Sequence, residues 1–434
     1  MRNLRKSIAV LGAVGTCATL ILGAGSAFAD NQPTAGDVVG VGSDTVQYVS
    51  DFFADGDPSG DAGYNGSVTN RDMSFFATGD GNGRALYDKS GTLLAGNGGA
   101  AEGTTTVVLR QGTKPVARPD GSGDGIAALT NDSIGGTKYE GLPNNSINYA
   151  RASRLPKPVE QTNCSNNASG CGGLHVFQFA SDNLEIAKWT GGTSNAVPLS
   201  KADLVAIYEC TITTWNAIPG NSGGSTATII PVIPQSGSGT RNFFEADLGI
   251  TDTNIGTCVE TSEEHDPTGI THAVKQGTST LDPANAIEPF SSARARLAAS
   301  GYYNNGPEPA SDFAIGLITG CSGVSSSWLS NGDTADQGFC GATDTVDPNQ
   351  PANGGTPINA QDGNAIYDSV RGLFFIVRDV DLTSLTPFQP GSTKNFSQVL
   401  FSGSTSFIAK TANQPLIRAA FLVPSYHDLG DAHS

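Results

Sequence analysis

The sequence predicts an α/β protein that is long enough to form two lobes. Short apolar stretches typical of buried strands alternate along the chain with capped or amphipathic helical stretches, and this alternation favours mainly parallel sheets. The chain has 434 residues, 38% of them hydrophobic and only 15% charged, so it can bury two cores and is not expected to be disordered. No internal repeat is visible.

The first half begins with a strand expected at residues 38–42, followed by a helix that Ser43 or Asp44 caps and that runs to residue 52. A Gly/Asp/Asn-rich segment at 54–120 is expected to be an insertion. The other elements expected in this half are a strand-like piece at 105–109, a helix at 126–129, and strands at 146–150 and 174–179.

The second half contains a capped helix at residues 200–208. Ser200 and Asp203 stand at the spacing of a capping box, in which each side chain accepts a hydrogen bond from the other's backbone. The other elements expected are a buried strand at 226–233, helices at 242–248 and 291–299, and an apolar strand at 373–377. Residues 320–363 are expected to form a long loop.

The charge balance excludes some partners. The chain has 24 basic and 41 acidic side chains, a net charge of −17, and the net charge is −20 without residues 1–29, which hold three basic residues and no acidic one. Such an excess argues against a nucleic-acid partner and against attraction to anionic membranes. A small anion would have to be bound by local geometry.

Residues 1–29 resemble a secretory signal peptide. Basic residues precede an apolar run, and Ala27-Phe28-Ala29 fits a cleavage site after Ala29. We therefore expect a secreted, extracellular protein without stable membrane insertion, acting as a monomer. A lipid anchor at Cys17 is the less favoured alternative, because Thr16 is unusual before a lipidated cysteine.

Six of the seven cysteines lie beyond the signal peptide, and an even number in an exported chain predicts disulfide bonds. Many pairings are open. We expect sequential pairs, which are Cys164–Cys171, Cys210–Cys258 and Cys321–Cys340. Zinc binding is disfavoured because no C-x-x-C motif occurs, and no metal site or cofactor is predicted.

Four loops share a design suited to an oxyanion. They lie at residues 42–45, 121–123, 151–154 and 236–241, and each places Gly, Ser or Thr at a turn, two of them with arginines. Such turns expose backbone N–H groups, and hydroxyls add further donors. The candidate ligand-binding residues are Ser43, Asp44, Thr45, Ser122, Gly123, Ser153, Arg154, Ser236, Gly237, Ser238, Gly239, Thr240 and Arg241, with Arg151 as a further cation.

The same segments resemble the phosphate-binding protein of phosphate ABC transporters. The helix 199–208 with the following Ile212-Thr213-Thr214-Trp215-Asn216 is similar to a segment of that family, and Gly237-Ser238-Gly239-Thr240 resembles its phosphate loop. Weaker similarities lie at residues 40–43, 119–123, 367–377 and 401–424. The resemblance runs in order over most of the chain after the signal peptide.

This resemblance implies a type II periplasmic-binding-protein-like fold, with two hinge-connected lobes and a ligand cleft between them. Lobe 1 would contain residues 30–177 and 360–434, and lobe 2 residues 178–359. It implicates in binding Asp44, Thr45, Ser122, Ser238, Gly239 and Thr240. The expected function is capture of a small oxyanion, most simply inorganic phosphate, with an ABC permease as the conditional partner.

The sequence departs from the family pattern at three positions. Pro234 stands where the family has Arg, Ser236 where it has Asp, and Arg154 where it has the Asp that accepts the proton of hydrogen phosphate. Asp44 or Asp124 is a candidate replacement acceptor. The departures leave sulfate and phosphate esters open as ligands.

No catalytic set follows from residue spacing, so an enzyme is not expected. His265 beside Asp266 is interpreted as a simple loop pair. The alternatives are a ligand-free cell-surface or matrix interaction protein on the same fold and, less favoured, a secreted phosphatase or esterase.

Overall fold

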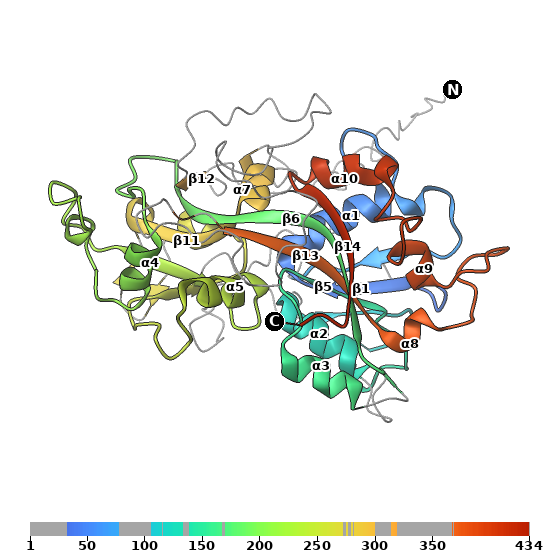
Figure 1. Cartoon of the computed structure of the whole chain (residues 1–434). Helices are drawn as coiled ribbons and strands as arrows, with labels where there is room; N and C mark the ends of the chain where they lie inside the picture. The colour runs from blue at the N-terminus through green and yellow to red at the C-terminus, as the bar shows by residue number, and fades with distance from the viewer. Residues whose placement is uncertain are drawn as a thin grey trace, which may run out of the picture. The chain divides into compact units, whose positions relative to one another are not determined.

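A mixed sheet organises the computed structural model (Figure 1), which describes residues 33–77, 106–114, 116–132, 139–166, 170–271, 275–276, 279–280, 282–299, 314–318, 367 and 369–433. Its strand order is β2-β1-β5-β13-β6-β11-β7-β8, and β12 and β14 also pair with β6. The strands of this sheet are β1 (Val38–Gly42), β2 (Asp72–Ser74), β5 (Tyr149–Ala152), β6 (Leu174–Trp189), β7 (Ile230–Pro234), β8 (Glu260–Ser262), β11 (Ala286–Ser291), β12 (Ile315–Ile318), β13 (Ser369–Arg378) and β14 (Val423–Gly430).

Two short hairpins lie outside this sheet, one formed by β3 (Thr106–Val107) and β4 (Val116–Ala117), the other by β9 (Lys275–Gln276) and β10 (Ser279–Thr280). The helices of the described residues are α1 (Asp44–Asp55), α2 (Gly121–Asn131), α3 (Pro158–Ser165), α4 (Lys201–Tyr208), α5 (Gly239–Leu248), α6 (Thr268–Thr271), α7 (Ser292–Ala299), α8 (Asp379–Leu382), α9 (Phe396–Leu400) and α10 (Gln414–Ala419).

The long strand β6 joins the two ends of the sheet. It pairs antiparallel with β11, β12, β13 and β14, whereas β1 pairs parallel with β2 and β5, and β7 pairs parallel with β8 and β11. The α/β prediction is confirmed. The sheet is parallel only towards its two ends, however, so the expectation of mainly parallel pairing was too simple.

Separate apolar clusters pack along the sheet. Phe179 and Phe375 belong to one cluster with α1 and α10, and Val39 and Ile126 to a second cluster near α2. At the other end, Trp215 and Phe244 lie in a third cluster, beside a smaller one around Phe290. The loops that follow β1, β5, β7 and β8 therefore stand on well-packed elements at both ends.

Local rules predicted several elements closely. The Ser200 side chain accepts a hydrogen bond from Asp203 N, as the capping box predicts, and α7 matches its expected range. Ser43 is the N-cap residue of α1, but its side chain makes no capping hydrogen bond. Compared with the predicted ranges, β5 and β7 lie later in the sequence, and α2 and α5 begin earlier. The helix α1 and the strand β13 extend beyond their predicted ends.

The largest correction concerns β6, which continues to Trp189, well past the expected end at residue 179. Its middle contains Ser181, Asp182, Asn183 and Glu185, a polar run typical of a loop. All four side chains are buried. Partners in neighbouring strands satisfy some of them, as in the hydrogen bond from Ser291 to Asp182, so the strand continues.

Disulfide bonds join Cys164 to Cys171 and Cys210 to Cys258, as predicted. The expected pair Cys321–Cys340 lies outside the described residues.

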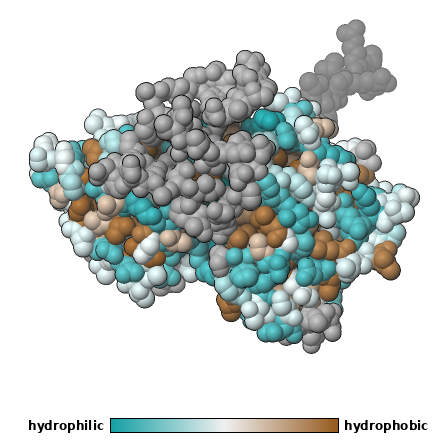
Figure 2. Space-filling model, viewed as in Figure 1, coloured by the Kyte–Doolittle hydropathy of each residue, from teal (hydrophilic) through white to brown (hydrophobic). Residues whose placement is uncertain are grey.

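No helix among the described residues is long and apolar enough to span a membrane. On the face drawn in Figure 2, hydrophobic residues are interspersed with hydrophilic ones, and the strongly exposed large apolar side chains of the described chain are Val159 and Leu385.

Candidate functional site

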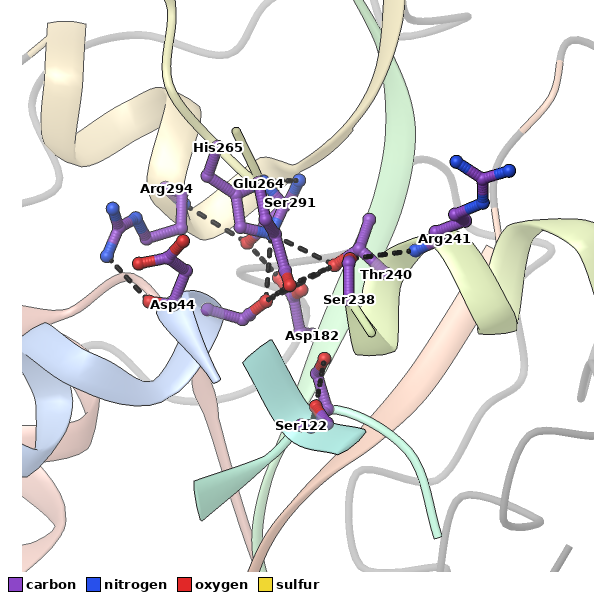
Figure 3. Close-up of polar contacts among 12 residues, drawn as sticks. Asp44, Ser122, Asp182, Ser238, Thr240, Arg241, Glu264, His265, Ser291 and Arg294 are labelled. Atoms are coloured by element: carbon purple, nitrogen blue, oxygen red, sulfur yellow. Dashed lines mark hydrogen bonds and ion pairs between the residues drawn. The ribbon is translucent and has the colours of Figure 1, made fainter. Parts of the chain in front are cut away.

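Loops from both ends of the sheet meet in a buried polar region (Figure 3). The backbone N–H of Gly123, in the first turn of α2, donates to the carbonyl of Gly237, 3.0 Å away, in the turn before α5. A Cβ atom on Gly239 would lie 2.2 Å from Ser122 Oγ and 2.3 Å from Ser153 Oγ. Only glycine allows this approach, so three of the predicted loops touch one another.

At the middle of this region two hydroxyls bind one carboxylate oxygen. Thr45 Oγ1 donates to Glu264 Oε1 over 2.7 Å, and Thr240 Oγ1 donates to the same oxygen over 2.6 Å. Thr45 lies on α1 and Thr240 on α5, so the donors come from helices that follow different strands. We call Thr45, Thr240, Glu264, His265 and Arg371 the Glu264 centre.

His265 is held in one neutral form. Its Nδ1 lies 3.2 Å from the backbone N of Ser291, which can only donate, so Nδ1 is the acceptor and the proton is on Nε2. Nε2 then faces Thr45 Oγ1 at 2.8 Å. Burial lowers the pKa of His265 to about 4, against the opposing effect of Glu264. The imidazole is therefore uncharged at neutral pH.

Arg371 supplies the positive charge of the centre. Its guanidinium donates to Thr240 Oγ1 over 2.6 Å and to Thr45 Oγ1 over 3.3 Å, and it is bound to Asp182 Oδ2 at 2.9 Å. Burial favours the protonated form of Glu264, but the hydrogen bond from His265 and the nearby charges outweigh it, and the pKa of Glu264 is lowered. Glu264 is therefore ionised.

A second group of acids lies next to this centre, comprising Asp44, Asp120 and Glu263; we call it the carboxylate cluster. One oxygen from each lies within 4.8 Å of the others. Burial raises the pKa of Asp44 to about 6, and burial together with the acidic neighbours raises the pKa values of Asp120 and Glu263 well above their usual range.

The structure brings together most of the predicted site residues and leaves others aside. Thr45 and Thr240 lie in the Glu264 centre and Asp44 in the carboxylate cluster. Ser238 caps α5, its Oγ accepting from Arg241 N, and Ser43 is buried with no partner for its Oγ. The other predicted residues at the contact between loops are Ser122, Gly123, Ser153, Gly237 and Gly239.

The predicted arginines are occupied elsewhere. Arg154 donates from both Nη atoms to the Glu160 carboxylate, at 2.8 and 2.7 Å. Arg241 binds Glu245 at 2.9 Å and also Asp252, and its guanidinium points away from the centre in Figure 3. Ser236 is exposed. Nearby acids thus bind the two guanidinium groups in this structure, and ligand binding by Arg154, Ser236 and Arg241 stays a prediction.

Arg151 lies on β5, is buried, and donates to Ser74 Oγ and, over 2.6 Å, to the carbonyl of Gly42 in the neighbouring strand β1. It positions the loop before α1. Asp124, the other candidate acceptor, is exposed. Of the two acceptors that the sequence left open, the structure places Asp44 in the buried region.

Sequence reasoning missed three of the five residues of the Glu264 centre and two of the three acids of the carboxylate cluster. His265 is fully buried in the network and is not a loop pair with Asp266. A usable signal was present, because Glu263-Glu264-His265-Asp266 directly follows β8. The carboxyl ends of parallel strands such as β7 and β8 place their loops together. Arg371 lies in a mostly apolar strand, and nothing in the sequence around it indicated a role in the site.

The chain belongs to the PBP superfamily, because the model of the PBP superfamily domain matches residues 97–402, well over half of the sequence. This confirms the predicted periplasmic-binding-protein-like fold. No curated protein matches the chain significantly.

Solved structures with a similar fold include three phosphate-binding proteins. They are an ABC-type phosphate transport receptor from Vibrio cholerae (14% identity, 89% of this chain and 99% of that chain covered, TM-score 0.41), a phosphate-binding protein from Stenotrophomonas maltophilia (14%, 90% and 90%, 0.41) and a human phosphate-binding apolipoprotein (16%, 89% and 91%, 0.46). At these identities and scores, the family assignment depends on the family model.

Proposed function

We propose that this protein is a solute-binding protein that captures a small oxyanion, inorganic phosphate first, without chemical change. The observation that carries the proposal is the convergence of the Thr45 and Thr240 hydroxyls on one anionic oxygen, Glu264 Oε1, with the Arg371 guanidinium donating to both hydroxyl oxygens. Donors that already hold a carboxylate oxygen in a buried place suit the oxygen of a phosphate equally well.

In this proposal the solute takes the place of the Glu264 carboxylate. A phosphate oxygen would accept the hydrogen bonds of Thr45 and Thr240, and Ser122 and Ser153 lie across the loop contact to add further donors. Glu264 then has to leave its donors before the solute can bind. It thus competes with the ligand, and its negative charge disfavours a dianion.

The proposal extends to where the protein works. We infer that residues 1–29 direct export and are removed, and that residues 30–177 with 360–434 move against 178–359 about a hinge. An ABC permease is the proposed partner, since family members that bind solutes outside the membrane need one to import them. The proposed ligand requires neither a nucleic acid nor a membrane.

Isothermal titration calorimetry of the purified protein tests the proposal, with phosphate, sulfate and a phosphate ester as separate titrants. We expect saturable 1:1 binding of phosphate. Thr240→Val should weaken it about 10- to 100-fold, the effect of losing one hydrogen bond to a charged group. Glu264→Gln should tighten it, because the competing charge is removed.

Thr261→Val is the matched control. Thr261 is buried like Thr240, but its hydroxyl has no hydrogen-bond partner, so the variant should bind phosphate as the wild type does. Binding heat with sulfate but not with phosphate would make sulfate the ligand, and the protein would remain a solute-binding protein. No heat with any anion would favour the ligand-free interaction protein, and release of phosphate from the ester would favour the phosphatase.

A further inference from the structure

The carboxylate cluster comes from three separate elements. Asp44 is the first residue of α1, Asp120 is the N-cap residue of α2, and Glu263 directly follows β8. The side chains of Asp44 and Glu263 are almost completely buried, each residue being 1% exposed. Three acids from three elements are thus brought to one buried place beside the Glu264 centre.

Two oxygens of this cluster have no hydrogen-bond donor. The Gln235 amide donates to Asp120 Oδ1 over 3.0 Å and to Glu263 Oε1 over 2.8 Å. Asp44 Oδ2 and Glu263 Oε2 are buried and have no partner other than the carboxyl groups of the cluster itself. Arg294, whose charge acts on Asp44, donates to the backbone carbonyl of Asp44 and lies over the Tyr48 ring. The orphaned oxygens therefore call for a further positive partner.

We propose that Asp44, Asp120 and Glu263 bind one hard divalent cation of the Mg²⁺ and Ca²⁺ class. The three ligand atoms are all carboxylate oxygens, which these cations prefer, and no thiolate or imidazole belongs to the cluster. Ligand atoms within 4.8 Å of one another can meet one cation, because two oxygens bound to Ca²⁺ at about 2.3–2.6 Å can be up to about 5 Å apart.

Such a cation would also change the solute site, and this step rests on the proposed function. Glu263 is adjacent in sequence to Glu264, and Asp44 to Thr45, so the cation would lie beside the hydroxyls that hold the anionic oxygen. It would offset the negative charge of the cluster. An oxyanion could then enter a region that is otherwise rich in acids.

The test uses the cation alone. The purified protein is treated with a chelator, freed of it, and titrated at pH 7.5 with MgCl₂ and with CaCl₂ in a phosphate-free buffer. We expect one bound cation per chain, with a rise in Tm that depends on its concentration. Glu263→Gln should weaken binding at least about tenfold, the cost of one lost charged ligand, and Asp120→Asn should act in the same direction.

Glu260→Gln is the matched control, since Glu260 lies on β8, has a buried oxygen without a partner, and lies outside the cluster. It should bind the cation as the wild type does. The absence of heat and of a Tm shift with both salts would overturn the proposal, as would equal affinity in Glu263→Gln and Glu260→Gln. Cation binding without phosphate binding would support this inference and contradict the proposed function; phosphate binding without cation binding would do the reverse.

Discussion

Glu263 and Glu264 are neighbours in the chain, both are buried, and their carboxylates behave in opposite ways. Glu264 accepts two hydroxyl hydrogen bonds beside the Arg371 guanidinium, and its pKa is lowered. Each glutamate has one oxygen without a partner, but Glu263 faces Asp44 and Asp120, and its pKa is raised. Burial is equal for the two, so the donors and charges around each carboxylate decide its ionisation.

The difference has a functional meaning. In the Glu264 centre, Glu264 Oε1 already has its donors although Glu264 Oε2 has no partner, so in the proposed function a solute reaches these donors only by exchange. The carboxylate cluster is unsatisfied and would gain from a cation. The loop after β8 therefore places one carboxylate among hydrogen-bond donors and the next among other acids.

Removing the Arg371 guanidinium from the Glu264 centre should have the largest effect on stability. Arg371→Met leaves Asp182 and Glu264 buried without their cation, which is expected to cost about 3–5 kcal/mol in the free energy of unfolding. Arg371→Lys keeps the charge and should cost less. Urea denaturation measures both variants, and a loss below about 1 kcal/mol in Arg371→Met would contradict the assigned role.

Exchanging Glu263 or Glu264 for glutamine should change the free energy of unfolding in opposite directions. Glu264→Gln loses charge-assisted hydrogen bonds and should lower the free energy of unfolding by about 1.5–3 kcal/mol. Glu263→Gln removes one of three mutually repelling carboxylates and should raise it when divalent cations are absent. Denaturation of chelator-treated protein at pH 7.5 compares them, and changes of the same sign would break the contrast.

Asp72 should have a smaller effect on the free energy of unfolding, and this effect depends on pH. It is buried, Tyr149 Oη donates to it over 2.9 Å, and burial raises its pKa to about 7. Because the folded pKa lies above the ordinary value of 3.8, its contribution to stability is complete below about pH 4 and is lost as the pH rises through 7. Between pH 6 and 8 this group alone should remove about 1.4 kcal/mol.

Asp72→Asn should abolish that loss while keeping an oxygen for Tyr149. Denaturation of the wild type and the variant at pH 6 and pH 8 measures the difference between the two slopes. Equal slopes would show that Asp72 does not titrate in this range.

Much of the fold followed from local patterns. The capping box of α4, the strand and glycine turn before α5, and the loops carrying Thr45 and Thr240 were predicted because turns and caps depend on residues close in sequence. The disulfide bonds Cys164–Cys171 and Cys210–Cys258 were also predicted.

The missed features depend on distant partners. Asp182 lies in a polar run, and local sequence rules predict that such a run ends the strand. Its partner Arg371 is 189 residues away in the sequence. Arg154 and Arg241 were expected at the ligand because a cation was missing there, whereas Glu160 and Glu245 lie close enough in sequence to bind them. Burial of Glu264 and His265 cannot be inferred from a run of charged residues.

The pairing of β6 with β13 has a consequence for the order in which the protein folds. Residues near 180 stay beside residues near 370 only after the intervening chain has been made, so the middle of the sheet closes late. Until then Asp182 is an edge-strand carboxylate without its guanidinium. A chain that ends before residue 371 could therefore not form the Glu264 centre, because its guanidinium would be missing.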